Sequence, residues 1–95
     1  MNAALYYTIR SRADGNYLVA YPDPDAPHRY LLVFAEHYEA LSYLNTHAQE
    51  VVSEFMVESV SQSQLRSILD RWQYQGIGVV QDPLLPRIEF MGLAP

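Results

Sequence analysis

Histidines and carboxylates are the side chains of this protein that most readily act as acid–base groups or metal ligands. His37 and His47 stand ten positions apart in one predicted helix. That spacing is about 80° short of whole turns, so their rings do not converge on one metal ion. Glu36 and Glu39 flank His37, but residues one or two positions apart do not face each other on a helix. No nucleophile is marked nearby, so the sequence predicts no metal site and no catalytic residues.

Two residue types that carry much enzyme chemistry are missing. The chain has no cysteine, and its six basic residues are all arginine. These absences exclude disulfides, thiolate nucleophiles and Schiff-base lysines. Gly76 and Gly78 precede a predicted strand instead of opening a helix, which is the wrong order for a nucleotide-binding loop. We therefore expect a non-enzymatic protein without a cofactor; the alternative is a small enzyme or small-ligand-binding protein that uses His37.

The chain is acidic, with a formal net charge of −5. Nucleic acids and anionic lipids are bound by a surplus of cations, so this charge argues against both as partners. The amino terminus lacks the basic and apolar regions of a secretory signal, and no window approaches the roughly 18 apolar residues of a membrane span. We expect a cytoplasmic protein with no nucleic-acid or membrane partner.

The eight tyrosines and the arginines near them are the main indication of function. Tyrosine suits half-buried strands in general, so packing alone can account for many of them. An exposed face rich in tyrosine and arginine would instead bind a protein, or stack the bases of a single-stranded nucleic acid. We predict a protein-interaction face that contacts another protein or a second copy of this chain. It consists of Tyr6, Tyr17, Tyr30 and Arg29.

The first third of the chain predicts a β-hairpin followed by a third strand. Residues 5–10 and 17–21 have strand-like patterns, and Asp14-Gly15 between them is typical of a tight turn. Residues 22–27 are rich in proline and aspartate and predict an extended acidic loop. Residues 29–34 form a mostly apolar run, which is typical of a buried strand.

Two amphipathic helices are predicted in the rest of the chain. The first spans residues 36–48, and its stripe toward the core consists of His37, Leu41, Leu44 and Ala48, with Ala40 beside it. Residues 55–60 predict a strand, after which Ser61 and Gln64 have the spacing of a capping box. The second helix begins there, and its apolar stripe consists of Leu65, Ile68, Leu69 and Trp72. Gly76 is placed to end it.

Residues 78–81 and 87–91 predict the last two strands, joined by a turn over residues 82–86. The element order is therefore β-β-β-α-β-α-β-β. Strands separated by helices favour an α+β fold with a mixed β-sheet and both helices packed on one face. At this length the chain fits one domain, residues 1–95.

Residues 29–83 contain a series of segments that also occurs in a known family. The main ones are Val33-Phe34, Leu65-Arg66-Ser67-Ile68-Leu69 and Gly76-Ile77-Gly78-Val79-Val80-Gln81-Asp82-Pro83. This series resembles the amino-terminal domain of the SseB family, bacterial proteins named for enhanced serine sensitivity. Where that family has Asn-Pro-Gly, this chain has Asp82-Pro83-Leu84. The resemblance implies a small α+β interaction domain and carries over no catalytic residues.

Overall fold

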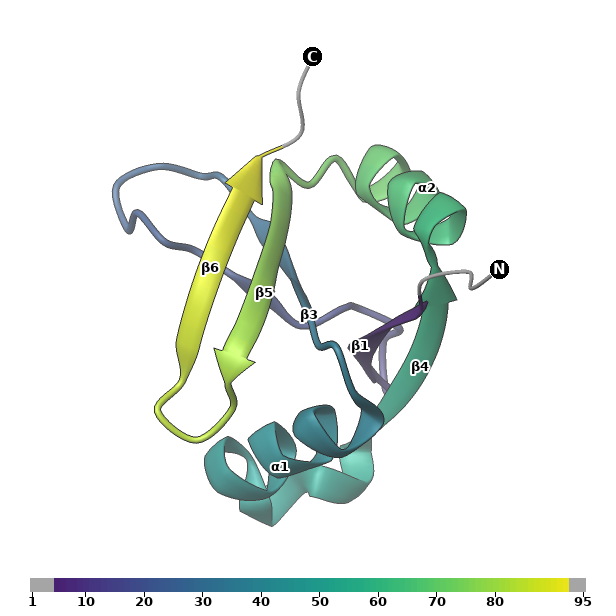
Figure 1. Ribbon diagram of the computed structural model, residues 1–95, viewed down its shortest axis with the longest axis vertical. Coiled ribbons are helices and arrows are strands. Elements are labelled where there is room, and N and C mark those ends of the chain that lie inside the picture. Colours follow the sequence, from purple (N-terminus) through teal and green to yellow (C-terminus); the bar gives the residue numbers. More distant parts are fainter. Residues whose placement is uncertain (1–4, 93–95) are drawn as a thin grey trace.

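The computed structural model describes residues 5–92, which form six strands, two α-helices and one 3₁₀-helix (Figure 1). The strands are β1 (Leu5–Ser11), β2 (Val19–Ala20), β3 (Tyr30–Val33), β4 (Phe55–Ser61), β5 (Gly76–Asp82) and β6 (Arg87–Gly92). The helices are α1 (His37–His47), the 3₁₀-helix η1 (Gln49–Glu54) and α2 (Gln62–Trp72). The predicted order of strands and α-helices is confirmed, with η1 added between α1 and β4.

The strands form two sheets that meet at β1. β1 pairs antiparallel with β4 over its whole length. The second sheet has the order β2-β3-β5-β6, in which β3 and β5 run parallel and the outer pairs run antiparallel. Tyr7 on β1 exchanges backbone hydrogen bonds of 2.9 and 2.8 Å with Phe34, just after β3. β1 and the end of β3 therefore join the two sheets.

β3 is buried on both faces, and each face has its own core cluster. Leu31, Leu32 and Val33 are at most 1% exposed. Leu32 packs in a cluster with the buried residues of α1, whereas Leu31 packs with those of α2. The buried residues are Ala40 and Leu44 in α1 and Leu65 and Leu69 in α2. Because neighbouring side chains of a strand point to opposite faces, α1 and α2 cover opposite faces of β3.

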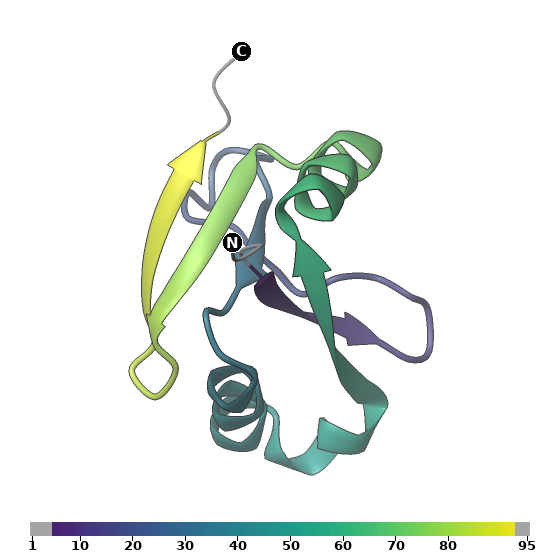
Figure 2. The same cartoon turned by 45° about the vertical axis from the view of Figure 1, so that its right-hand side comes forward.

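Figures 1 and 2 show the two helices far apart, on either side of the strands. The α+β class and the mixed sheet are confirmed, but the helices do not pack on one face of a single sheet as we expected. The apolar run at residues 31–34 is the physical reason. A strand with one covered face alternates apolar and polar residues, whereas a strand that is apolar at every position is covered on both faces.

α2 begins where the sequence predicts and ends earlier. The Oγ atom of Ser61 accepts a hydrogen bond of 3.2 Å from the backbone N–H of Gln64, which confirms the capping box. Gln73 closes the helix in the left-handed conformation, with φ 57°. The prediction that Gly76 ends the helix is therefore wrong; Gly76 is the first residue of β5.

α1 turns a different stripe to the core than the one predicted. Ala40 and Leu44 are its buried residues, whereas His37 and Leu41 are exposed. The sequence alone does not fix which side of a short helix faces the core, because β3 and β1 determine where the helix sits. Of the four residues in the predicted stripe, Leu44 is the one that is fully buried.

The predicted hairpin is present but short. The backbone N–H of Ser11 donates a hydrogen bond of 2.8 Å to the carbonyl of Asn16. The N–H of Leu18 donates one of 2.9 Å to the carbonyl of Ile9, after which the chain leaves β1 and pairs as β2 with β3. The acidic loop at residues 22–27 follows, as predicted.

Thr8 is fully buried on β1, and its hydroxyl has no hydrogen-bond partner among the described residues. We expect Thr8→Val, which replaces the hydroxyl with a methyl group, to raise the free energy of unfolding in urea by about 1 kcal/mol. Thr8→Ser keeps the hydroxyl and loses the methyl group, so it should lower the stability. A less stable Thr8→Val protein would mean that the hydroxyl is hydrogen-bonded and would contradict this prediction.

Gly76 leaves no room for a side chain, because a Cβ there would overlap the backbone carbonyl of Met91 on β6. We expect Gly76→Ala to lower the free energy of unfolding by about 1–3 kcal/mol. Gly92 faces Gly76 across the strand pair and is the matched control, since the nearest atom to a Cβ at Gly92 is 3.9 Å away. Equal stabilities of the two alanine variants in thermal unfolding would refute the steric explanation.

Candidate functional site

The four residues predicted to form an interaction face lie in three places. Tyr17 and Arg29 belong to a row of aromatic and arginine side chains at the C-terminal end of α2. Tyr6 lines a groove on the other side of α2. Tyr30 packs against Phe90 of β6, with ring centres 5.3 Å apart. The structure brings Tyr17 and Arg29 together and leaves Tyr6 and Tyr30 apart from them.

The row, called the aromatic array below, consists of Arg10, Tyr17, Trp72, Tyr74 and Arg29. The Arg10 guanidinium lies 4.7 Å from the centre of the Tyr17 ring, and the Tyr17 and Trp72 rings form a T-shaped pair with centres 5.6 Å apart. Trp72 stacks on Tyr74 at 6.1 Å, and the Arg29 guanidinium lies 5.0 Å from the centre of the Tyr74 ring. Each cation–π contact of this kind contributes about 0.5–1 kcal/mol. The array therefore ties the hairpin to the end of α2.

Arg29 also anchors the end of α2 through a hydrogen bond. Its Nη2 atom donates a hydrogen bond of 3.0 Å to the carbonyl of Trp72, one of the carbonyls that a helix leaves without an internal partner at its C-terminus. Burial raises the pKa of Tyr74, and the positive charge of Arg29 acts in the opposite direction. The Arg29 side chain is thus held within the fold.

An open groove with a volume of about 710 Å³ lies between α2, β4 and the hairpin, and is called the α2 groove below. Its aromatic and charged lining residues are Tyr17, Trp72, Arg10, Arg71 and Glu58. Serine side chains from α2 and β4, with Val60 and Ile68, complete its walls. One end of the aromatic array therefore forms part of a concave surface.

The α2 groove carries more positive than negative charge although the whole protein is acidic. Arg10 is already engaged, because its Nη1 atom lies 3.6 Å from the Glu58 carboxylate and its Nε atom donates a hydrogen bond of 2.7 Å to Gly15. Arg71, in the last turn of α2, forms no ion pair with another residue of the described range. Its charge is available to a ligand in the groove.

A second, smaller groove of about 180 Å³ runs along the other side of α2, next to β5 and β6. Its lining is largely apolar and includes Tyr6, Leu65, Leu69, Ile77 and Met91. Tyr6 is therefore separated from Tyr17 by the width of the helix.

Trp72 and Arg71 are groove residues that the sequence analysis missed. Trp72 falls on the apolar stripe of a predicted helix and was assigned to packing, and Arg71 was not considered. The signal that would have found them is the combination of tryptophan and arginine, which are enriched at binding hot spots, at the exposed end of such a stripe.

The histidine and carboxylate side chains of the described residues were the candidates for acid–base or metal chemistry. Within residues 5–92, no group of three or more histidine, aspartate and glutamate side chains could hold a metal ion. His37 is exposed at the start of α1, packs edge-on against Tyr7 at 5.7 Å and lines neither groove. No described helix is long and apolar enough to cross a membrane.

Comparison with solved structures finds a protein with a similar fold. No family model matches the chain, and no curated protein matches it in sequence. A solved structure of Anabaena Tic22, described as a protein of protein transport, superimposes with a TM-score of 0.58 at 14% sequence identity. The match covers 87% of this chain and 37% of the Tic22 chain, so this chain spans well under half of that protein. At this identity the likeness shows a shared α+β fold.

Proposed function

We propose that this protein is a non-enzymatic protein-interaction module that binds an extended segment of a partner protein in the α2 groove. The observation that carries the proposal is the composition of that groove. Tryptophan, tyrosine and arginine dominate binding hot spots, and Trp72, Tyr17, Arg10 and Arg71 all line this one surface. Aromatic side chains bring a large contact area at a small entropic cost.

The groove suits a short extended segment. Its α2 wall runs from Ser63 to Trp72, which spans roughly 14 Å of helix. An extended chain rises about 3.3 Å per residue, so four residues fit along this wall. Trp72 and Ile68 would contact an apolar side chain of the segment, and Arg71 would pair with a carboxylate.

Two likenesses support a role in binding proteins. The resemblance to the SseB family implies an interaction domain, and the Tic22 structure belongs to a protein described by its part in protein transport. The alternative function, an enzyme or ligand-binding protein that uses His37, has no comparable support. His37 packs against Tyr7 at the start of α1 and lines neither groove.

The proposal is tested by affinity purification of the tagged protein from its native cells, followed by mass spectrometry. We expect Arg71→Glu to reduce recovery of the partner about tenfold, because it reverses the free charge of the groove. Tyr17→Ala should have a similar effect because it removes an aromatic wall. Circular dichroism of each variant checks that the fold is kept.

Arg66→Glu is the matched control, because it makes the same charge change on an exposed residue of α2 that does not line the α2 groove. The intrinsic fluorescence of Trp72, the single tryptophan, gives a second measurement once a partner is identified. Equal loss of the partner in Arg66→Glu and Arg71→Glu, or recovery of no partner with the wild-type protein, would count against the α2 groove as a binding site.

A further inference from the structure

The segment from Leu84 to Met91 exposes apolar side chains at both ends of β6. It holds four of the nine large hydrophobic side chains that are exposed within residues 5–92. Leu84 and Leu85, in the turn before β6, are 59% and 75% exposed, and Phe90 and Met91, near the end of β6, are 38% and 45% exposed. Exposed apolar side chains of this kind are common where a protein surface contacts a partner.

The turn that carries the two leucines is held in place by polar contacts. The Asp82 carboxylate accepts a hydrogen bond of 2.9 Å from the backbone N–H of Leu84. His47 of α1 donates one of 2.8 Å from Nε2 to the carbonyl of Pro83. The leucines are therefore presented to solvent on a fixed turn, and a partner that covers them need not order the turn first.

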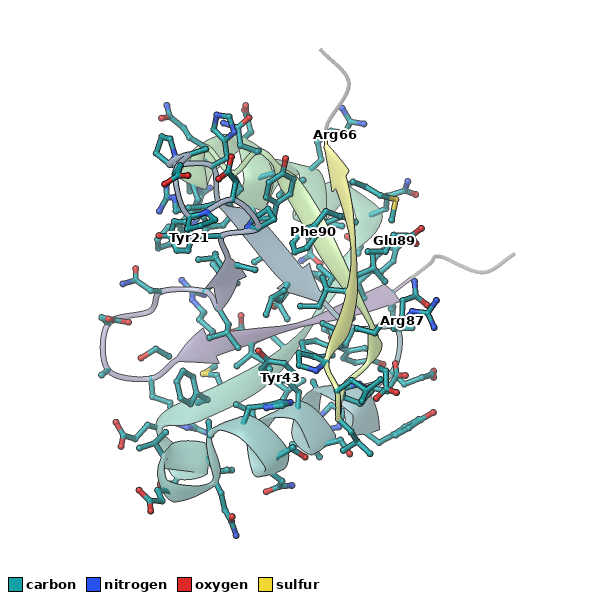
Figure 3. The ribbon with its side chains drawn as sticks, turned by 90° about the vertical axis from the view of Figure 1, so that its left-hand side faces the viewer. Tyr21, Tyr43, Arg66, Arg87, Glu89 and Phe90 are labelled. Carbon is teal, nitrogen blue, oxygen red and sulfur yellow. The ribbon has the colours of Figure 1, made fainter. Side chains whose placement is uncertain are left out.

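β6 is the last strand of its sheet and pairs only with β5 among the described strands. Its other edge carries backbone N–H and C=O groups that another strand can pair with. Figure 3 shows Arg87 and Glu89 on one side of β6 and Phe90 on the other. Arg87 and Glu89 are thus two positions apart on the same face of β6, whose outer edge is unpaired among the described strands.

We infer that two copies of this chain associate through β6, antiparallel, about a two-fold axis at Ile88. Residues at equal distances from Ile88 then face each other, so Arg87 of each copy lies opposite Glu89 of the other. Opposite charges that face each other across an antiparallel pair are stabilising. The same register places Phe90 and Met91 of each copy beside the turn that precedes β6 in the other copy, which carries Leu84 and Leu85.

Other two-fold registers fit less well. An axis at Glu89 places the two Glu89 carboxylates opposite each other, where like charges repel. An axis at Phe90 leaves Arg87 beyond the end of the other β6 and leaves the leucines of the turn uncovered. The register at Ile88 pairs both charges and brings the apolar residues at the two ends of β6 near each other.

The test is sedimentation equilibrium of the full chain and of two charge variants. Arg87→Glu and Glu89→Arg each convert both Arg–Glu pairs into like-charge pairs, so each should raise the dissociation constant of the dimer about tenfold or more. An equimolar mixture of the two variants restores both pairs across the interface, so it should form a heterodimer about as tightly as the wild type.

The mixture separates contacts between copies from contacts within one copy. Glu89 accepts a hydrogen bond of 3.2 Å from Gln81 on β5, and mixing cannot repair the loss of that contact within a Glu89→Arg copy. Arg71→Glu and Glu50→Arg make the same charge changes at exposed sites away from β6 and should leave the dimer unchanged. A monomeric wild type, variants that dimerise normally, or a mixture that stays monomeric would each overturn the inference.

This self-association is independent of the α2 groove, and the two proposals fail separately. A monomeric protein that loses its partner on Arg71→Glu would refute the dimer and support the groove. If the wild type is a dimer that the β6 variants dissociate, but its affinity purification recovers no other protein, the dimer is supported and the α2 groove is refuted as a partner site.

Discussion

The burial of β3 on both faces is the constraint on which the rest of the structure depends. Four successive apolar side chains, from Leu31 to Phe34, are at most 1% exposed, and each contributes roughly 1.5–3 kcal/mol by leaving water. One strand cannot supply that burial alone. α1 covers one face and α2 covers the other, β2 and β5 pair along the two edges of β3, and β1 pairs with Phe34 just after it. The two grooves exist because a single helix is narrower than the face that it covers.

Much of the fold follows from local sequence patterns. The element order, the capping box at Ser61 and the hairpin turn at Gly15 all depend on residues close together in the chain, and all are confirmed. The placement of the helices was wrong because it depends on contacts between distant segments. The end of α2 was wrong for a different reason: Gln73 adopts the left-handed conformation, which a sequence pattern assigns to glycine.

The interaction site was harder to predict than the fold because it depends on strand register. Val19 faces Leu31 and Ala20 faces Tyr30, so Tyr17, two positions before Val19, points to the opposite side from Tyr30. A shift of the pairing by one residue would have placed both tyrosines on one face. Nothing in the tyrosine spacing reveals that register. Arg29 was identified correctly as an arginine beside aromatic rings, yet its hydrogen bond to the Trp72 carbonyl depends on where α2 ends.

The pairing of β1 with β4 also determines the order in which the chain can fold. Leu5 faces Ser61, so more than half of the chain separates the two partners of this sheet. Folding slows as contacts become more distant in sequence, because a long loop must close before any contact forms. During synthesis β1 is made first and has no strand partner of this kind until α1, η1 and β4 have followed it. β1 can therefore be held early only by the hairpin and by Phe34, and its full-length pairing with β4 is among the later contacts to form.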